Sequence, residues 1–344
     1  MQTTVDVANM AIGVVGAGSW GTALANLLAV KGFSVDHWVY EAEVLEEMVT
    51  EKENRRFLPG VALSDNLHPS GDLEAVVTGK DLVLVVTPSH VTRQTIERCG
   101  AAIGPATIVV SASKGIENQT HLTMSGVLNE VIPGLSYERL AVLTGPSFAK
   151  EVARKMATVV TVASSNADTA ALVQQTFATP YFRVYTIDDV IGAELGAAVK
   201  NVIAIAAGVI DGLGLGLNTR AALITRGLVE IRRLGLAMGA QPRTFTGLAG
   251  AGDLILTCTG DLSRNHTIGK QIGEGKKLKD LLAEMHMVAE GVKTARSVYN
   301  LSRKLGVDMP ISHSIYRVLY EDLDPKTALH RLMTRDLKAE LDHV

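Results

Sequence analysis

The alternation of short apolar runs with longer amphipathic stretches constrains the fold of this chain more than any other feature. Seven such runs precede residue 188, and they read AIGVVG, SVDHWVY, DLVLVVT, TIVVSAS, LAVLTG, ATVVTVAS and YFRVYT. Runs of this length with helical stretches between them predict the strands of a largely parallel sheet wrapped by helices. We therefore expect an α/β domain in the first half of the chain.

The second half of the chain has a different pattern. After YTIDD, which ends at Asp189, the strand-like runs stop and glycine-punctuated helical segments follow. Asp188 and Asp189 can each cap the first of these helices. A chain of 344 residues also exceeds the usual size of a single hydrophobic core. We predict an α/β domain at residues 1–187 and an all-α domain at residues 188–344.

Composition excludes several classes of protein. The net charge is −3, and lysines and arginines are scattered, so we expect no nucleic-acid partner. Cys99 and Cys258 are far apart and lack metal-ligand spacing, so we expect buried thiols in a reducing compartment and no metal site. The N-terminus lacks the pattern of a secretory signal, and Lys200 and Asn201 interrupt the longest apolar run. We expect a cytoplasmic protein without membrane insertion.

A glycine motif directly follows the first predicted strand and opens the next predicted helix. GVVGAGSWG contains Gly16, Gly18 and Gly21 in the spacing G-x-G-x-x-G. The first glycine permits a tight turn, the second lets the backbone approach a pyrophosphate, and the third lets the helix pack closely on the strand. The free N–H groups of the helix N-terminus then face the phosphates. We interpret this motif as a dinucleotide-binding turn.

Two residues at the end of the second predicted strand bear on the choice of dinucleotide. Glu41 can accept a hydrogen bond from the adenosine ribose 2′-OH, which favours NAD over NADP; alternatively, it caps a loop. Tyr40 can stack on the adenine or pack against its own strand.

A lysine lies in the middle of an otherwise apolar predicted helix, AELGAAVKNVIAIAAG. The neighbours of Lys200 at three and four residues are Gly196, Ala197, Ile203 and Ala204, so another surface can approach this face closely. Burial lowers a lysine pKa by up to about 3–5 units, which makes the amine a usable base near neutral pH. The alternative is a side chain that extends along the helix to water.

Polar turns follow three predicted strands, in VVTPSH, SASKGIE and LTGPSFAKE. Ligands of open α/β sheets bind beyond the carboxyl ends of the strands, so these turns should surround a nicotinamide and a substrate. Lys114 is the cation of the second turn, and it is either a site residue or a solvated surface lysine.

A later segment, LAGAGDLILTCTGDLSRNHTIGK, combines a predicted tight turn before Asp253 with three polar residues just before a predicted helix. Ser263, Arg264 and Asn265 can form a phosphate site together with the helix N–H groups, or Ser263 can simply cap the helix. Asp253 can orient Lys200, bind a substrate hydroxyl or cap a helix.

Ten motifs in one order resemble those of the bacterial-type NAD(P)-dependent glycerol-3-phosphate dehydrogenases. They are GAGSWGTALA, FLPG, VVTPSH, SKGIE, GPSFAKEV, AAVKNVIAIAAG, TRAALITRGL, GAGDLILTCTG, SRN and VAEGV, and they span nearly the whole chain. The resemblance implies a Rossmann-like N-terminal domain, an all-helical C-terminal domain and a site between them. It implies reversible oxidation of sn-glycerol 3-phosphate to dihydroxyacetone phosphate with NAD or NADP, in a homodimer that supplies phospholipid synthesis.

The resemblance also implies a role for each matching residue. The general acid/base lysine of the family falls on Lys200, and Lys114 is the second catalytic group. The substrate positions are Lys114, Gly145, Ser147, Lys200, Asp253, Ser263, Arg264 and Asn265. The cofactor positions are Ser19, Trp20, Tyr40, Lys114, Ala149, Arg264, Val288 and Glu290, in addition to Glu41 and the glycines Gly16, Gly18 and Gly21.

Two other readings remain open at this point. A related two-domain hydroxy-acid dehydrogenase would share the cofactor domain and a helical lysine, but not the need for a phosphate site at SRN. A non-catalytic dinucleotide sensor would bind the dinucleotide with the first domain and carry out no reaction. The presence of Lys114, Lys200 and Asp253 argues against this alternative.

Overall fold

The predicted sheet is present in the computed structural model, which describes residues 10–284, 289–337 and 339–340. Its eight strands lie in the order β3-β2-β1-β4-β5-β6-β7-β8, and neighbours are parallel except for β6 and β7. The strands are β1 Ile12–Val15, β2 Val35–Trp38, β3 Leu67–Ser70, β4 Leu82–Val85, β5 Ile108–Ser111, β6 Leu140–Thr144, β7 Thr158–Ala163 and β8 Phe182–Ile187. The strand order reverses between β1 and β4, which is where open sheets of this kind bind ligands.

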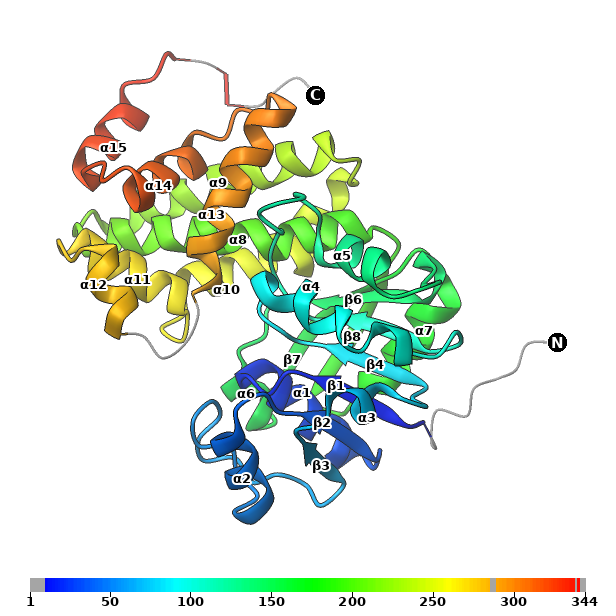
Figure 1. Cartoon of the computed structure of the whole chain (residues 1–344). Coiled ribbons are helices and arrows are strands. Elements are labelled where there is room, and N and C mark those ends of the chain that lie inside the picture. Colours follow the sequence, from blue (N-terminus) through cyan, green and yellow to red (C-terminus); the bar gives the residue numbers. More distant parts are fainter. Residues whose placement is uncertain (1–9, 285–288, 338, 341–344) are drawn as a thin grey trace.

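Helices cover both faces of the sheet and then build the second half of the molecule (Figure 1). Those of the first half are α1 Ser19–Lys31, α2 Ala42–Thr50, α3 Leu73–Val77, α4 Ser89–Glu97, α5 Met124–Val131, α6 Ala149–Ala153 and α7 Ala167–Phe177. Those of the second half are α8 Val190–Gly212, α9 Gly216–Ala237, α10 Asp253–Thr259, α11 Arg264–Gly273, α12 Leu278–Glu284, α13 Glu290–Leu305, α14 Pro310–Tyr320 and α15 Pro325–Met333. The predicted fold class is confirmed.

Alternate residues of the central strands enter hydrophobic clusters on opposite faces of the sheet. Val14 joins one cluster and Val15 the other, as the two-residue period of a strand requires. All four residues of β1 and of β4 are buried, because helices cover both faces. This rigid sheet positions the turns at its carboxyl edge.

Two features differ from the sequence prediction. An eighth strand, β3, reads LHPS; it has no apolar run, because it lies at the sheet edge and only Leu67 is buried. Strand β2 ends at Trp38, so Tyr40 and Glu41 lie in the turn beyond the strand and not at its end.

Helix α8 is the central helix of the second half. Asp189, one of the two predicted caps, accepts a hydrogen bond from Gly192 N at 2.9 Å. A Cβ atom added to Gly208 would lie 2.0 Å from His266 O of α11, so the small residues of α8 do allow close helix packing. By length and hydropathy α8 is the one described helix that could cross a membrane, but 89% of its apolar window is buried inside the protein. It is therefore a core helix.

Candidate active site

Two helices of the second half bring Lys200 and Asp253 together. Lys200 lies in the middle of α8, and Asp253 is the first residue of α10. The Lys200 Nζ atom donates to Asp253 Oδ1 at 2.5 Å and to Thr257 Oγ1 at 2.7 Å. Lys200 is 5% exposed and Asp253 1% exposed. They form a buried ion pair, so the alternative in which Lys200 extends to water is wrong.

Thr257 is a contact of Lys200 that the sequence analysis missed. Its hydroxyl donates to the backbone oxygen of Asp253 at 2.6 Å, so the lone pairs of the hydroxyl oxygen face Lys200. Both partners of the Lys200 nitrogen are therefore hydrogen-bond acceptors. A neutral amine gives its two hydrogens to them, and its lone pair occupies the remaining position. The only sign of this role in the sequence was the four-residue spacing between Asp253 and Thr257, which puts both on one face of a helix.

Lys114 reaches the same carboxylate from the first half of the chain. It follows β5, its side chain is 18% exposed, and its Nζ atom donates to Asp253 Oδ2 at 2.9 Å. Asp253 thus joins two lysines, one from each half. The alternative in which Lys114 is a solvated surface lysine is wrong. Three roles were considered for Asp253, and the structure shows the contact with Lys200.

Burial is the main determinant of the Lys200 charge. Loss of solvation lowers the pKa of Lys200 from 10.5 to about 7. The Asp253 carboxylate opposes this shift by raising the pKa, and the Lys114 ammonium adds to it by lowering the pKa further. Near neutral pH both forms of the amine are therefore populated, which suits a group that accepts and returns a proton.

The backbone before Asp253 is a π-helix at Leu248–Gly252, not the predicted tight turn. A Cβ atom added to Gly196 of α8 would lie 2.3 Å from Ala249 O of this π-helix. The missing side chain lets the segment pack against α8 one helical turn from Lys200, and α10 continues from it. Close packing of small residues therefore carries Asp253 to the lysine.

The SRN segment forms the start of α11. Ser263 is the N-cap residue and accepts a hydrogen bond from His266 N at 3.3 Å. Arg264 and Asn265 lie in the first turn of the helix, whereas the sequence analysis placed them just before it. The side chain of Arg264 is exposed and makes no hydrogen bond with any described residue, while no acidic residue occupies this first turn. The N–H groups and the guanidinium are both available to an anion.

Asn265 is held in place from two sides. Its Nδ2 atom donates to Asn201 Oδ1 at 3.0 Å, and its Oδ1 atom accepts from Gly291 N at 3.0 Å. Asn201, which neighbours Lys200 in sequence, therefore serves to position Asn265. One N–H of the Asn265 amide is left for a ligand.

The turn after β6 contacts the second half of the molecule. Gly145 has a φ of 132°, which favours glycine, and its backbone oxygen accepts from Ser147 Oγ at 3.0 Å. A Cβ atom at Gly260 would lie 2.6 Å from the ring of Phe148, so α10 and this turn are closely packed. Ala149 begins α6, which packs on α1.

The glycine turn has the geometry that a pyrophosphate requires. Gly16 has a φ of 115°, and a Cβ atom at Gly21 would lie 1.9 Å from Gly16 O. Nothing lies within 4 Å of a Cβ atom added to Gly18, so the turn is open above it. The first turn of α1 has no side-chain cap and no acidic residue. These features fit a dinucleotide.

Neighbouring residues support the same fit. Trp20 Nε1 is buried and has no hydrogen-bond partner in the described part of the chain, so it can donate to a bound group. Ser19 Oγ donates to Phe57 O, which fixes it against the following loop. In that loop Asn54 is fully buried and donates to Ala17 O at 2.9 Å. Asn54 braces the glycine turn, and the sequence analysis missed it because no motif marks it.

The remaining cofactor positions lie on both halves of the chain. Tyr40 is 74% exposed and meets Trp38 edge-on at 5.9 Å. Glu41 is the N-cap residue of α2, but its side chain makes no capping hydrogen bond. Glu290 Oε2 accepts from Ser89 Oγ at 2.6 Å, and burial raises the pKa of Glu290. Val288 lies outside the described residues.

Both cysteines are free and buried, as predicted. Burial raises the pKa of Cys99 to about 11 and that of Cys258 to about 12, so neither is a thiolate at neutral pH. Among the described residues no group of three or more histidine, cysteine or acidic side chains is placed to hold a metal ion.

A cavity of about 690 Å³ is lined by residues outside this cluster. Ser89 and Ile116 line it, but Lys114, Lys200 and Asp253 do not. We place the candidate active site at the lysine–aspartate cluster, because the paired charges and the shifted lysine pKa are found there.

Comparisons with known proteins agree on one family. Residues 11–170 match the sequence model described as the N-terminus of NAD-dependent glycerol-3-phosphate dehydrogenase, and residues 189–330 match that of its C-terminus. The chain is 57% identical to a glycerol-3-phosphate dehydrogenase (NAD(P)+) of Geobacter sulfurreducens over 329 residues, which are 96% of this chain and 98% of the relative. It is 56% identical to the glycerol-3-phosphate dehydrogenase (NAD(P)+) of Syntrophobacter fumaroxidans over 331 residues, which are 96% of this chain and 97% of the relative. The crystal structure of a Coxiella burnetii glycerol-3-phosphate dehydrogenase superposes with a TM-score of 0.91 at 40% identity, covering 95% of this chain and 99% of the other.

Proposed function

The chain belongs to the NAD-dependent glycerol-3-phosphate dehydrogenase family, and on this premise we propose that it interconverts sn-glycerol 3-phosphate and dihydroxyacetone phosphate, with Lys200 as the proton-transfer group. The observation that carries the proposal is the buried Lys200 amine, whose two hydrogen-bond partners are both acceptors. A bound NAD or NADP supplies the hydride acceptor for oxidation and the hydride donor for reduction.

Lys200 handles the proton of the C2 hydroxyl. In the direction of oxidation the neutral amine accepts this proton through the lone pair that Asp253 and Thr257 leave open, while the hydride leaves C2. In the direction of reduction the ammonium returns the proton to the C2 oxygen. Lys114, which is bound to the other carboxylate oxygen of Asp253, stabilises the negative charge that develops on the C2 oxygen of the substrate.

The start of α11 holds the substrate phosphate. Arg264 contributes a planar fork of donors, Asn265 one amide hydrogen, and the helix N-terminus its free N–H groups. Gly145 and Ser147 form the facing turn. The fixed phosphate sets the distance of C2 from Lys200, so the reacting atoms are positioned before the reaction begins.

A bound cofactor would lie along the carboxyl edge of the sheet. The residues that would hold it are Gly16, Gly18, Ser19, Trp20, Gly21, Tyr40, Glu41, Lys114, Ala149, Arg264, Val288 and Glu290. Glu41, free of any capping bond, favours the 2′-hydroxyl of NAD. A hydroxy-acid dehydrogenase would not require the phosphate site at α11, so that alternative is not favoured.

We further propose the organisation in which this activity operates. Residues 1–187 form the dinucleotide-binding domain and residues 188–344 the helical domain that carries the substrate. The protein is a cytoplasmic homodimer that works chiefly in the direction of reduction, to supply glycerol phosphate for phospholipids. Sedimentation of the purified protein tests the dimer.

The decisive experiment follows nicotinamide absorbance after mixing the purified protein with dihydroxyacetone phosphate and either NADH or NADPH. We expect oxidation of the cofactor, faster with NADH. Lys200→Ala should retain cofactor binding and lose about 10²–10⁴-fold in kcat, the usual contribution of a general acid/base. Full turnover by this variant would refute the role of Lys200, and no oxidation by folded wild-type protein would refute the function.

A further inference from the structure

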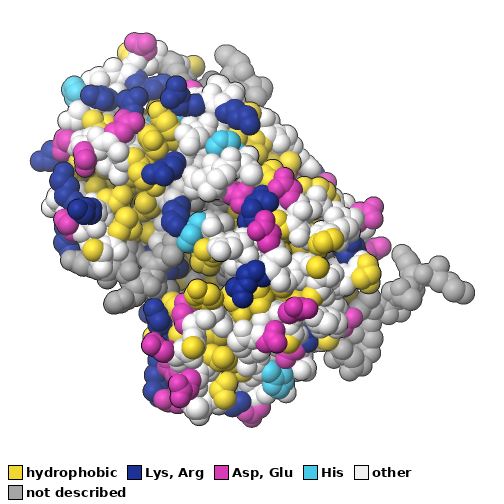
Figure 2. Space-filling model, viewed as in Figure 1, with side chains coloured by type: hydrophobic (Ala, Val, Ile, Leu, Met, Phe, Trp, Pro, Cys, Tyr) yellow, Lys and Arg dark blue, Asp and Glu magenta, His cyan; other side chains and the backbone are white. Residues whose placement is uncertain are grey.

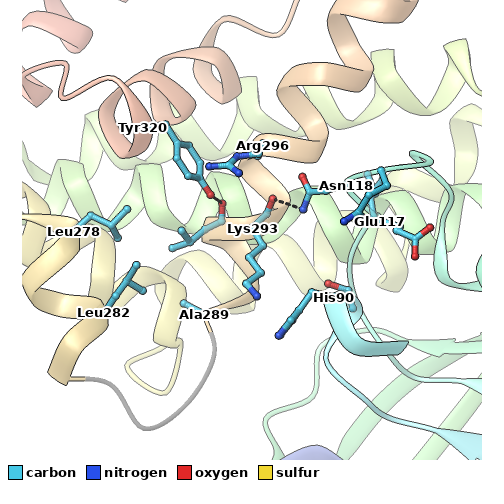
Figure 3. Close-up of a pocket in the computed structure, with 13 residues that line it drawn as sticks. His90, Glu117, Asn118, Leu278, Leu282, Ala289, Lys293, Arg296 and Tyr320 are labelled. Carbon is cyan, nitrogen blue, oxygen red and sulfur yellow. Dashed lines mark hydrogen bonds between the residues drawn. The ribbon is translucent and has the colours of Figure 1, made fainter. Parts of the chain in front are cut away.

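The cavity beside the active site has the size of a separate ligand site. It opens between α12, α13 and the segments that follow β4 and β5 (Figure 3). Its volume of about 690 Å³ lies within the range of about 300–1,000 Å³ that small-molecule sites occupy. The catalytic lysines do not line it. A second molecule can therefore bind here without displacing the substrate.

One wall of the cavity is apolar. Leu278 and Leu282 lie four residues apart on α12 and so share a face of that helix (Figure 3). Ala289 and Val292 also line the cavity. Leu282 is 46% exposed. An aliphatic chain laid against this wall would bury surface that is now in contact with water.

The neighbouring wall is cationic. Lys293 and Arg296 lie one helical turn apart on α13, and neither side chain makes a hydrogen bond or ion pair with any described residue. The guanidinium of Arg296 lies over the ring of Tyr320 at 4.3 Å, and Tyr320 OH is fixed on Val292 O at 2.7 Å. This cation–π contact holds the guanidinium in place, and no described residue hydrogen-bonds to its N–H groups.

His90 adds a third nitrogen group to this wall. Its ring lies close to the Lys293 ammonium in Figure 3. Burial lowers the pKa of His90, and the Lys293 charge lowers it further. Among the described residues that line the cavity, Glu117 is the acidic one, and its charge is balanced because its two oxygens accept from Arg93 at 2.9 Å each. The cavity therefore has a positive field beside a hydrophobic surface, and Figure 2 shows Lys and Arg side chains next to hydrophobic ones on this face of the molecule.

We infer that this cavity binds a phosphate monoester that carries an unbranched apolar chain. The dianionic phosphate lies at Lys293 and Arg296, because neither cation forms an ion pair with a described residue. The chain lies against Leu278 and Leu282. Inorganic phosphate would use only the cationic wall, and an alcohol of the same chain length only the apolar one.

Binding of n-octyl phosphate, measured by isothermal titration calorimetry on the full chain at saturating NADH, tests this inference. Inorganic phosphate and 1-octanol are the two partial probes. We expect octyl phosphate to bind at least about tenfold more tightly than either, because burial of even a few methylene groups or one charge-assisted contact is worth that factor. Equal affinity for octyl phosphate and inorganic phosphate would overturn the inference, as would binding of octyl phosphate that occurs only when NADH is left out.

Variants assign the binding to the two walls. Lys293→Met with Arg296→Met should weaken octyl phosphate binding about tenfold or more. Leu282→Ser should weaken octyl phosphate and leave inorganic phosphate unchanged. Lys304→Met, a change to an exposed lysine near the other end of α13, is the matched control and should have no effect. Unchanged binding in the double variant would overturn the inference. Because no turnover is measured, failure here leaves the proposed function standing.

Discussion

The pH dependence of the reaction reports directly on the environment of Lys200. Oxidation requires the neutral amine, and the pKa of Lys200 is about 7. About half of the enzyme is then competent at pH 7, whereas a lysine with the usual pKa of about 10.5 would be neutral in about one molecule in 3,000. We expect kcat/KM for glycerol 3-phosphate to rise with pH to a plateau, with a midpoint near 7. For dihydroxyacetone phosphate it should fall with pH over the same range.

Asp253→Asn changes this midpoint in a direction that the structure specifies. The carboxylate contacts Lys200 Nζ at 2.5 Å and raises its pKa, so its removal should lower the midpoint of oxidation by about 1–3 pH units, the usual effect of one adjacent opposite charge. Lys114→Met removes a charge that lowers the pKa of Lys200. It should move the midpoint upward by about one unit, a smaller shift because Lys114 is partly exposed and contacts the other carboxylate oxygen.

Initial rates of cofactor reduction, measured from pH 5 to pH 10 at constant ionic strength, give the three midpoints. Each variant also loses rate, because both side chains lie in the site, but the midpoint is independent of the plateau height. Shifts of the two variants in the same direction, or a wild-type midpoint above about 9, would refute the assignment of the titrating group to Lys200.

Three further predictions test other parts of the structure. Asn54→Ala removes the hydrogen bond to Ala17 O, so in steady-state kinetics the KM for NADH should rise about tenfold with little change in the KM for dihydroxyacetone phosphate; equal changes in both would contradict the bracing role. Thr257→Val leaves Lys200 Nζ without one acceptor and should lower kcat about tenfold in the same assay, with cofactor binding intact. Glu230 is buried, and its pKa is raised to about 7, so the folded state holds this proton between about pH 4.5 and 7 and the free energy of unfolding should fall by about 3 kcal/mol across that range. Urea denaturation should show this loss in the wild type and a smaller one in Glu230→Gln.

The sequence predicted those parts of the site that depend on short segments. The glycine turn, the capped start of α11 and the lysine on a face of small residues each follow from residues within about one helical turn of one another. The order of these short motifs along the chain was also enough to establish the resemblance to the family. Where a local pattern was weak, the prediction failed: β3 has no apolar run, and the π-helix before Asp253 resembles a turn in its composition.

Contacts between distant segments could not be predicted in this way. Lys114 and Asp253 are 139 residues apart, and Lys200 and Asp253 are 53 residues apart. Whether Lys200 was a base or a solvated side chain was undecided on the helix alone, because desolvation depends on what packs against the helix.

The sequence by itself determined the strands other than β3, the change to helices after Asp189, the dinucleotide turn and the residue types available for chemistry, because these depend on periodicity and backbone sterics within short segments. Only the tertiary structure decided the state of the Lys200 amine. The π-helix packs against Gly196, brings Asp253 to α8, and excludes water from the pair, while the turn after β5 adds Lys114 to the same carboxylate. The pKa of a group depends on the charges, dipoles and solvent within several ångströms of it, and only the folded structure brings these together.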